Sequence, residues 1–264
     1  MIKHIIFFFI ISLNFNFAFS RNTGETEITT EDGIEVFQEE KYYLLKKNVE
    51  IFSDDFELRG QLVKIYFDKD LYDIQRLVAT KDVEFSSDIY GIKGSGENLE
   101  FNINNEKITV KGKDSKLFLE TTEMFSDEII IVNNIGGSFS ITGSKSKLIS
   151  ENLYITGSKI NGTFEIIEGN RDITNLKVED EIELHIITNK TEMFSKKAIY
   201  DRKKSIIELF ENVKIKRGNE VIVGDYGILD TNKNSYKVSS KNSNKVKAVI
   251  TNSEWANFKY LMMD

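Results

Sequence analysis

Apolar and polar residues alternate with a period of two in block after block of this chain. Clear blocks are Asn48-Val49-Glu50-Ile51, Lys107-Ile108-Thr109-Val110, Ser138-Phe139-Ser140-Ile141 and Glu181-Ile182-Glu183-Leu184. Successive side chains of a strand point to opposite faces, so this alternation predicts strands with one buried and one solvated face. Many of the apolar positions carry the β-branched or aromatic residues that a pleated surface favours. The pattern predicts an all-β protein.

A longer repeat is superimposed on the alternation. A valine flanked by polar residues is followed eleven positions later by a glycine, at Val49 with Gly60, Val83 with Gly94, and Val213 with Gly224. The unit has room for two strands of about five residues and a tight turn, and we expect the glycines to end strands. Because the repeat spans most of the chain, one elongated domain over residues 21–250 is predicted, built of two layers of antiparallel sheet around an apolar interior. Residues 251–264 are predicted to form a C-terminal tail.

The first twenty residues differ from the rest. Lys3 precedes an apolar run from Ile5 to Leu13, and Ala18-Phe19-Ser20 supplies small residues at the end. This order is typical of a secretory signal peptide and predicts export to the periplasm, with cleavage after Ser20. The run is shorter than the roughly 20 apolar residues that span a bilayer. An uncleaved membrane anchor is the alternative.

Every second residue of a strand points to the same side, so the apolar residues of the alternating blocks are assigned to an inward face. Either an ordinary sealed core or a lipid-lined interior would have this composition. The residues assigned to it are Val49, Ile51, Phe56, Leu58, Ile65, Phe67, Val83, Phe85, Leu209, Val213, Ile215 and Val223.

Composition excludes several classes of function. The formal net charge is −7, which argues against a nucleic-acid partner, because binding phosphates requires a cationic surface. The chain contains no cysteine, so disulfides, cysteine-ligated zinc and thiol chemistry are excluded together. The domain must be held together by its own core.

Catalytic and metal-binding patterns are weak. Beyond the first twenty residues the one histidine is His185; it shares the parity of Glu183, and we expect it to point outward without a catalytic partner. Carboxylates cluster between apolar blocks, where turns are expected, and lack the alternating spacing of a calcium loop. We therefore predict a non-enzymatic protein without cofactor or metal. The acidic clusters are Glu39-Glu40, Asp54-Asp55, Asp127-Glu128 and Glu179-Asp180-Glu181.

Three consecutive blocks resemble the repeat of the LptA/OstA family, which runs Ala-x-Tyr-Asp, an apolar strand, Gly-Asn-Val-x-apolar and a Gly-Asp turn. Here the blocks are Ala198-Ile199-Tyr200-Asp201, Ile207 to Ile215, and Val221-Ile222-Val223-Gly224-Asp225. Ala79-Thr80-Lys81-Asp82-Val83 resembles the family's Ala-x-Gly-x-Val. The chain departs from the pattern where the family has glycine, with Lys47, Lys81 and Glu211. The resemblance covers about 30–113 and 196–238.

The resemblance implies an OstA-like β-jellyroll that carries lipopolysaccharide across the periplasm in the outer-membrane biogenesis of a Gram-negative bacterium. Lipid A acyl chains would lie against the inward face, because exposing them to water costs about 0.8 kcal/mol per CH₂. The implied partners are LptC-like and LptD-like jellyrolls or further copies stacked head to tail, since an unpaired terminal strand can pair with another chain.

Three other interpretations stay open at this point. An uncleaved segment 1–20 would make the protein an LptC-like, membrane-anchored component of the same pathway. A β-solenoid surface protein would stack the repeats around a closed core. A carbohydrate-active β-helix enzyme would need a carboxylate pair, whose two members can lie anywhere in the sequence.

Overall fold

The structure is a computed structural model that describes residues 24–69, 73–168, 170–188, 191–240 and 245–251. The signal peptide predicted at 1–20 lies outside these residues, as does the tail predicted at 251–264 apart from Thr251. In the described part of the chain, no helix has the length and hydropathy to cross a membrane.

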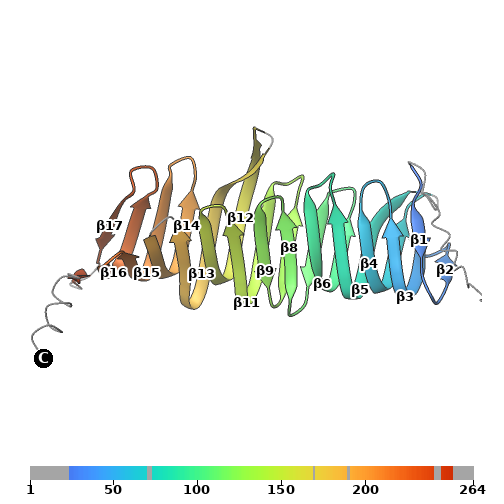
Figure 1. Cartoon of the computed structure of the whole chain (residues 1–264), viewed down its shortest axis with the longest axis horizontal. Coiled ribbons are helices and arrows are strands. Elements are labelled where there is room, and N and C mark those ends of the chain that lie inside the picture. The colour runs from blue at the N-terminus through green and yellow to red at the C-terminus, as the bar shows by residue number, and fades with distance from the viewer. Residues whose placement is uncertain (1–23, 70–72, 169, 189–190, 241–244, 252–264) are drawn as a thin grey trace, which may run out of the picture.

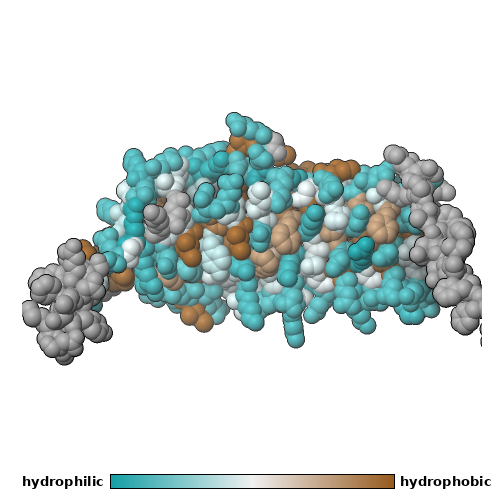
Figure 2. Space-filling model, in the orientation of Figure 1, coloured by the Kyte–Doolittle hydropathy of each residue, from teal (hydrophilic) through white to brown (hydrophobic). Residues whose placement is uncertain are grey.

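The described chain is all-β, as predicted, and successive strands follow one another along its long axis (Figure 1). Each pairing is antiparallel. The outer surface in Figure 2 is mainly hydrophilic. The strands are β1 (Glu27–Thr29), β2 (Ile34–Phe37), β3 (Tyr42–Phe52), β4 (Glu57–Phe67), β5 (Ile74–Ser87), β6 (Ile92–Asn102), β7 (Lys107–Lys111), β8 (Ser115–Leu119), β9 (Thr122–Ser126), β10 (Ile129–Asn133), β11 (Ser138–Ser150), β12 (Leu153–Ile167), β13 (Asn170–Thr188), β14 (Thr191–Asp201), β15 (Ile206–Arg217), β16 (Glu220–Asp230), β17 (Ser235–Ser239) and β18 (Lys247–Ile250).

Each long strand is interrupted near its middle by a shift in register. In β3 the pairing with β4 breaks between Lys46 and Val49, and in β15 the pairing with β16 breaks between Phe210 and Val213. A bulge of this kind bends a strand. The two halves of each long strand therefore lie in two different layers, which face each other across the apolar interior.

The strand pairings give the order of the strands in each layer. The first layer begins with β2 and ends with β17, the second begins with β1 and ends with β18, and each long strand contributes one half to each layer. In the middle of the molecule β7 and β10 belong to the first layer, while β8 and β9 belong to the second. This is the two-layer jellyroll-type architecture expected, and it also covers residues 113–190, where the resemblance was poor.

The two long edges of this folded sheet differ. At one edge, here called the closed edge, the strand bends join the layers covalently, as at 47–48, 81–82 and 211–212. At the other, here called the mouth, hairpin turns of the two layers face each other, such as 103–106 and 134–137 in the first layer and 88–91 and 120–121 in the second.

The bends contain the three residues that stand where the resembled motif has glycine. Lys47, Lys81 and Glu211 all have left-handed backbones, with φ of 67°, 63° and 65°. Asn48, Asp82 and Asn212 follow with φ of 49°, 52° and 56°. Glycine adopts this conformation without a steric cost, and Asn and Asp tolerate it best among the other residues. These three positions therefore have a backbone conformation in which glycine would be unstrained.

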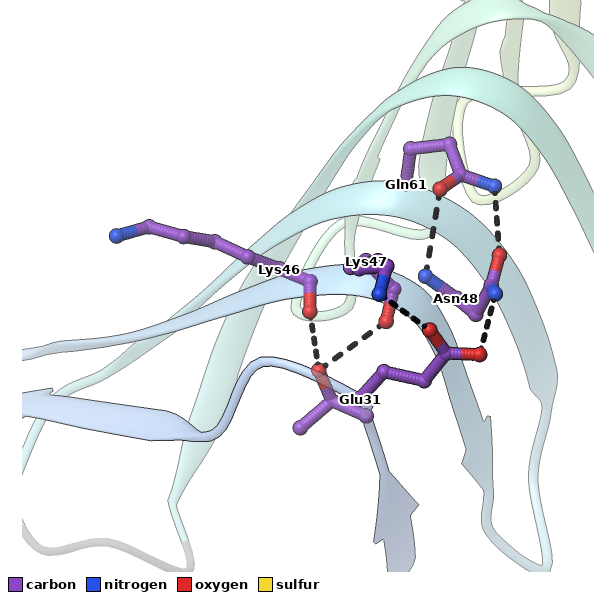
Figure 3. A network of polar contacts seen from close by, with 6 residues as sticks. Glu31, Lys46, Lys47, Asn48 and Gln61 are labelled. Carbon is purple, nitrogen blue, oxygen red and sulfur yellow. Dashed lines mark hydrogen bonds and ion pairs between the residues drawn. The ribbon is translucent and has the colours of Figure 1, made fainter.

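The first bend is held by a polar network (Figure 3). Lys47 Nζ lies 2.8 Å from a carboxylate oxygen of Glu31, and Asn48 Nδ2 donates to the other oxygen at 2.7 Å. Gln61 of β4 exchanges two hydrogen bonds with Asn48. The contacts of Glu31 with Lys47 and with Asn48 hold the pKa of its carboxyl below its usual range. The network ties the segment before β2 to the closed edge.

The repeat glycines do not end strands, contrary to the prediction. Gly60 and Gly224 lie within β4 and β16, directly opposite Val49 and Val213. A Cβ on Gly224 would lie 2.6 Å from Cγ1 of Val238 and 2.8 Å from a backbone oxygen. The strands bend near these points instead of ending. At Gly224 the crowding leaves no room for a side chain, whereas a Cβ on Gly60 would have its nearest neighbour at 3.6 Å, an ordinary contact.

The antiparallel pairing also bears on two of the alternatives. Coils of a β-helix stack their strands in parallel. None of the registered pairs among the described strands is parallel. The β-solenoid and β-helix enzyme interpretations therefore lose their structural basis.

Candidate functional site

The apolar interior between the two layers is the candidate site. Its side chains form a single buried cluster that extends from Leu45 in β3 to Leu229 in β16. Eleven of the twelve residues assigned to the inward face are buried, and all of these except Phe67 belong to the cluster: Val49, Ile51, Phe56, Leu58, Ile65, Phe67, Val83, Phe85, Leu209, Val213 and Ile215.

Val223 was assigned wrongly. Its cross-strand partners are Lys214 and Lys247, and directly paired residues share a face of the sheet. The inward positions of this half-strand belong to Ile222, which pairs with Ile215, and to Gly224. Residues 221–223 are three consecutive β-branched residues, so there was no alternation to choose their face, and the pairing with β15 decided it.

Aromatic side chains close the mouth near the N-terminal end of the molecule. Phe85 in the second layer and Phe101 in the first have ring centroids 5.0 Å apart. Phe56 and Tyr90, from turns of the second layer, contact Phe101 at 6.3 and 5.6 Å in edge-on geometry. The layers are thus in contact here, held by side-chain packing.

Polar contacts close the mouth near its C-terminal end. Arg217, beside the β15–β16 turn, donates to the backbone oxygen of Asn234 at 2.9 Å. The Tyr236 hydroxyl, in the first layer, donates to Glu220 in the second. Burial and this hydrogen bond raise the pKa of Tyr236 to about 12. The hydroxyl therefore keeps its proton, and the donated bond, at any physiological pH.

An ion pair lies across the mouth in the middle of the molecule. Arg171, at the start of β13 in the first layer, pairs with Glu120 of the β8–β9 turn in the second. Neither residue was expected at a site from the sequence, and nor were Phe101 or Tyr236; among the residues that close the mouth, Phe56 and Phe85 were assigned to the inward face. No motif marks the others, because partners such as Arg171 and Glu120 are 51 positions apart.

The layers are joined differently at their two edges. The closed edge is continuous backbone, whereas the contacts described across the mouth are made by side chains. Side-chain contacts can separate while the backbone hydrogen bonds between paired strands stay intact. The geometry therefore allows the interior to open along one edge while the other stays fixed.

Other candidate chemistry lies on the outer face or at the bends. His185 faces outward, as predicted, and stacks on Phe194 with centroids 4.3 Å apart. Its ring also lies 3.5 Å from a carboxylate oxygen of Glu192. Asp127, in one of the acidic clusters, accepts hydrogen bonds from Ser144 and the backbone of Lys145 at a bend. Within the described ranges, no group of three or more His, Cys, Asp or Glu residues is placed to hold a metal ion.

Comparisons with known proteins give little beyond this geometry. No family model matches the sequence, and no curated protein matches it. Among solved structures, a match is LptH, the LptA-homologous periplasmic component of the lipopolysaccharide transport device of Pseudomonas aeruginosa. The alignment covers 86% of this chain and 96% of that chain, with 8% identity and a TM-score of 0.23. A likeness at that level supports no conclusion about function, so the proposal below depends on the geometry and on the repeat motifs.

Proposed function

We propose that the protein binds lipopolysaccharide through its acyl chains and carries it across the periplasm between the inner and outer membranes. The observation that supports this most is a continuous apolar interior between two layers that are joined covalently along one edge only. A lipid sliding along this interior keeps its acyl chains out of water without any chemical step, so the protein needs no catalytic centre. The energy for movement comes from other components.

Acyl chains suit this interior better than a compact ligand does. The buried side chains are mostly aliphatic or aromatic, with a few serines and threonines such as Ser87 and Thr122 among them. An acyl chain of about a dozen carbons gains roughly 0.8 kcal/mol for each CH₂ that leaves water. Separating the layers at the mouth exposes such a face along the whole length, where several chains can bind side by side.

Photo-crosslinking in cells tests the proposal. We place benzoylphenylalanine at Phe67 and Phe85, which are inward and already aromatic, so that the larger ring disturbs the core least. Tyr66 and Phe118 are the matched outward controls, and Tyr66 is the immediate neighbour of Phe67. We expect lipopolysaccharide adducts at the two inward positions and at neither control. Equal labelling of both sets, or no adduct at either inward position, would contradict the lipid-bound interior.

We further propose that the molecule extends its path by pairing end strands with LptC-like and LptD-like jellyrolls or with further copies of itself. The strands at the two ends of the layers expose apolar side chains: Ile34 and Val36 in β2, and Val249 and Ile250 in β18. An unpaired edge of this kind is a template for another strand.

Charged residues at one end strand should block this assembly. We expect Ile34→Lys together with Val36→Lys to weaken head-to-tail self-association at least tenfold in analytical ultracentrifugation, because two lysines oppose pairing of that edge. Ile182→Lys, at an exposed bend far from the ends, is the control. Unchanged association of the β2 variant would rule out this end as the contact.

A further inference from the structure

The β12–β13 hairpin projects beyond its neighbours at the mouth. The pairing of β12 with β11 stops at Thr163, and the pairing of β13 with β14 begins at Asn175. In the strand register, the residues between them are matched only with each other, as in Ile166 with Arg171. In Figure 1 the hairpin rises above the neighbouring turns and leans toward β8 and β9.

Arg171 links this hairpin to both sides of the mouth. Its Nη1 forms the ion pair with Glu120, whose other carboxylate oxygen accepts a hydrogen bond from the Arg171 backbone N–H at 2.9 Å. Its Nε donates to Oδ1 of Asn134 at 3.0 Å, in the β10–β11 turn of the first layer. The Arg171 side chain is 11% exposed and that of Glu120 is 29% exposed. We name the Arg171–Glu120 pair the latch.

Apolar side chains are exposed around the latch. Ile166 lies on the hairpin, Ile135 in the neighbouring turn of the first layer, and Ile89 in a turn of the second layer, with exposed fractions of 70%, 64% and 63%. Figure 2 shows hydrophobic surface on the hairpin and along the upper edge beside it. Apolar surface that gathers in one patch marks an interaction site more often than singly exposed apolar residues do.

We propose that the latch is a lipid-loading port: the anionic headgroup of an acylated lipid replaces Glu120 as the partner of Arg171, and the acyl chains pass between the separated turns. This inference rests on the proposed function and adds the place and the headgroup chemistry. Phosphate oxygens match the two-pronged geometry of a guanidinium as well as a carboxylate does. Glu120 moves into water when it is displaced, so no unpaired charge is left buried.

The port belongs in the middle of the molecule because of the chemistry of the contacts there. The N-terminal part of the mouth is closed by aromatic rings, and the C-terminal end by a backbone oxygen and a tyrosine–carboxylate bond. Neither offers a cation whose anionic partner can be exchanged. The latch does, so an anionic lipid binds the open state more tightly than the closed state, and this difference is what shifts the equilibrium.

A distance measurement across the mouth tests the latch. The chain has no cysteine, so the double variant Ile89→Cys with Ile135→Cys has two thiols, one on each side of the mouth. Spin labels are attached to these thiols, and double electron–electron resonance measures the distance between them. Glu120→Gln should lengthen the distance without ligand, as should Arg171→Gln. Arg202→Gln is the control, since Arg202 pairs with Asp172 at 2.7 Å within the first layer of the same hairpin region. If neither latch variant changes the distance, or if the control changes it equally, the latch is refuted.

Headgroup chemistry is tested with the same labels and a binding titration. Bisphosphorylated lipid A should lengthen the distance in the otherwise unsubstituted protein and bind about tenfold more tightly than the dephosphorylated lipid with identical acyl chains. Arg171→Gln should abolish that preference and Arg171→Lys should restore part of it. Inorganic phosphate alone should leave the distance unchanged; opening by phosphate would show an anion switch independent of lipid and would overturn the port.

The two proposals fail in different ways. The port would be overturned, and lipid binding left intact, if two results were found together. The unsubstituted protein and Arg171→Gln would each bind both lipids equally, and adducts would still form at Phe67 and Phe85. Absence of binding by either lipid, together with absence of those adducts, would overturn the proposed function and the headgroup site with it.

Discussion

Replacing Phe101 with Ala is expected to lower the free energy of unfolding by about 3–5 kcal/mol. Phe101 is fully buried, and its ring contacts Phe56, Phe85 and Tyr90, so it links both layers and two turns of the mouth. Truncation removes the buried ring and leaves a cavity between layers that can collapse only in part. Equilibrium unfolding in urea measures the effect, and the midpoint should fall without a change in slope.

Phe118→Ala provides the comparison for this variant. Phe118 lies on the outer face of β8, between the buried residues Leu117 and Leu119, and contacts Phe125 edge-on at 6.2 Å. We expect its loss to cost less than about 1 kcal/mol. If the two phenylalanine variants were equally stable, the layers would not meet at Phe101, and the two-layer interior would be wrong at its best-packed point.

Glycine and valine at residue 81 should change the free energy of unfolding in opposite directions. Lys81 has a left-handed backbone at a bend. We expect Lys81→Gly to raise the free energy of unfolding by about 1 kcal/mol, because relief of the strained backbone exceeds the added entropy of the unfolded chain. Lys81→Val should lower it by about 2 kcal/mol, because a β-branched residue is poorly tolerated at positive φ. Glu211→Gly should act like Lys81→Gly, and urea unfolding measures all three.

An ordinary strand lysine gives the opposite pattern and serves as the control. Lys93 is exposed in β6 and is not among the residues with positive φ. Lys93→Gly should cost about 0.5–1 kcal/mol, and Lys93→Val should be close to neutral, since valine favours strands. Lys47→Gly should gain less than Lys81→Gly, because it also removes the ion pair with Glu31. A loss of stability in both Lys81→Gly and Glu211→Gly would contradict the bent-strand geometry.

The bends also show how far local sequence determines this fold. Alternation predicted the strands and placed eleven of twelve residues on the inward face, because the period of two is a property of the strand itself. The same pattern misled at Gly60 and Gly224, since a glycine that bends a strand and one that ends it look alike in sequence. Left-handed residues at Lys47, Lys81 and Glu211 were equally hidden, because lysine and glutamate carry no local signal for positive φ.

The all-β fold class, the repeated pair of strands and an apolar face long enough to line an interior could be predicted from the residues. The identity of the joined edge, the outward direction of Val223 opposite Lys214 and the contact of Arg171 with Glu120 became visible in the folded chain. Alternation comes from the backbone of each strand, whereas register and contacts across the mouth come from pairing between segments far apart in the chain. The interior was predictable from the residues, and the latch that closes it was not.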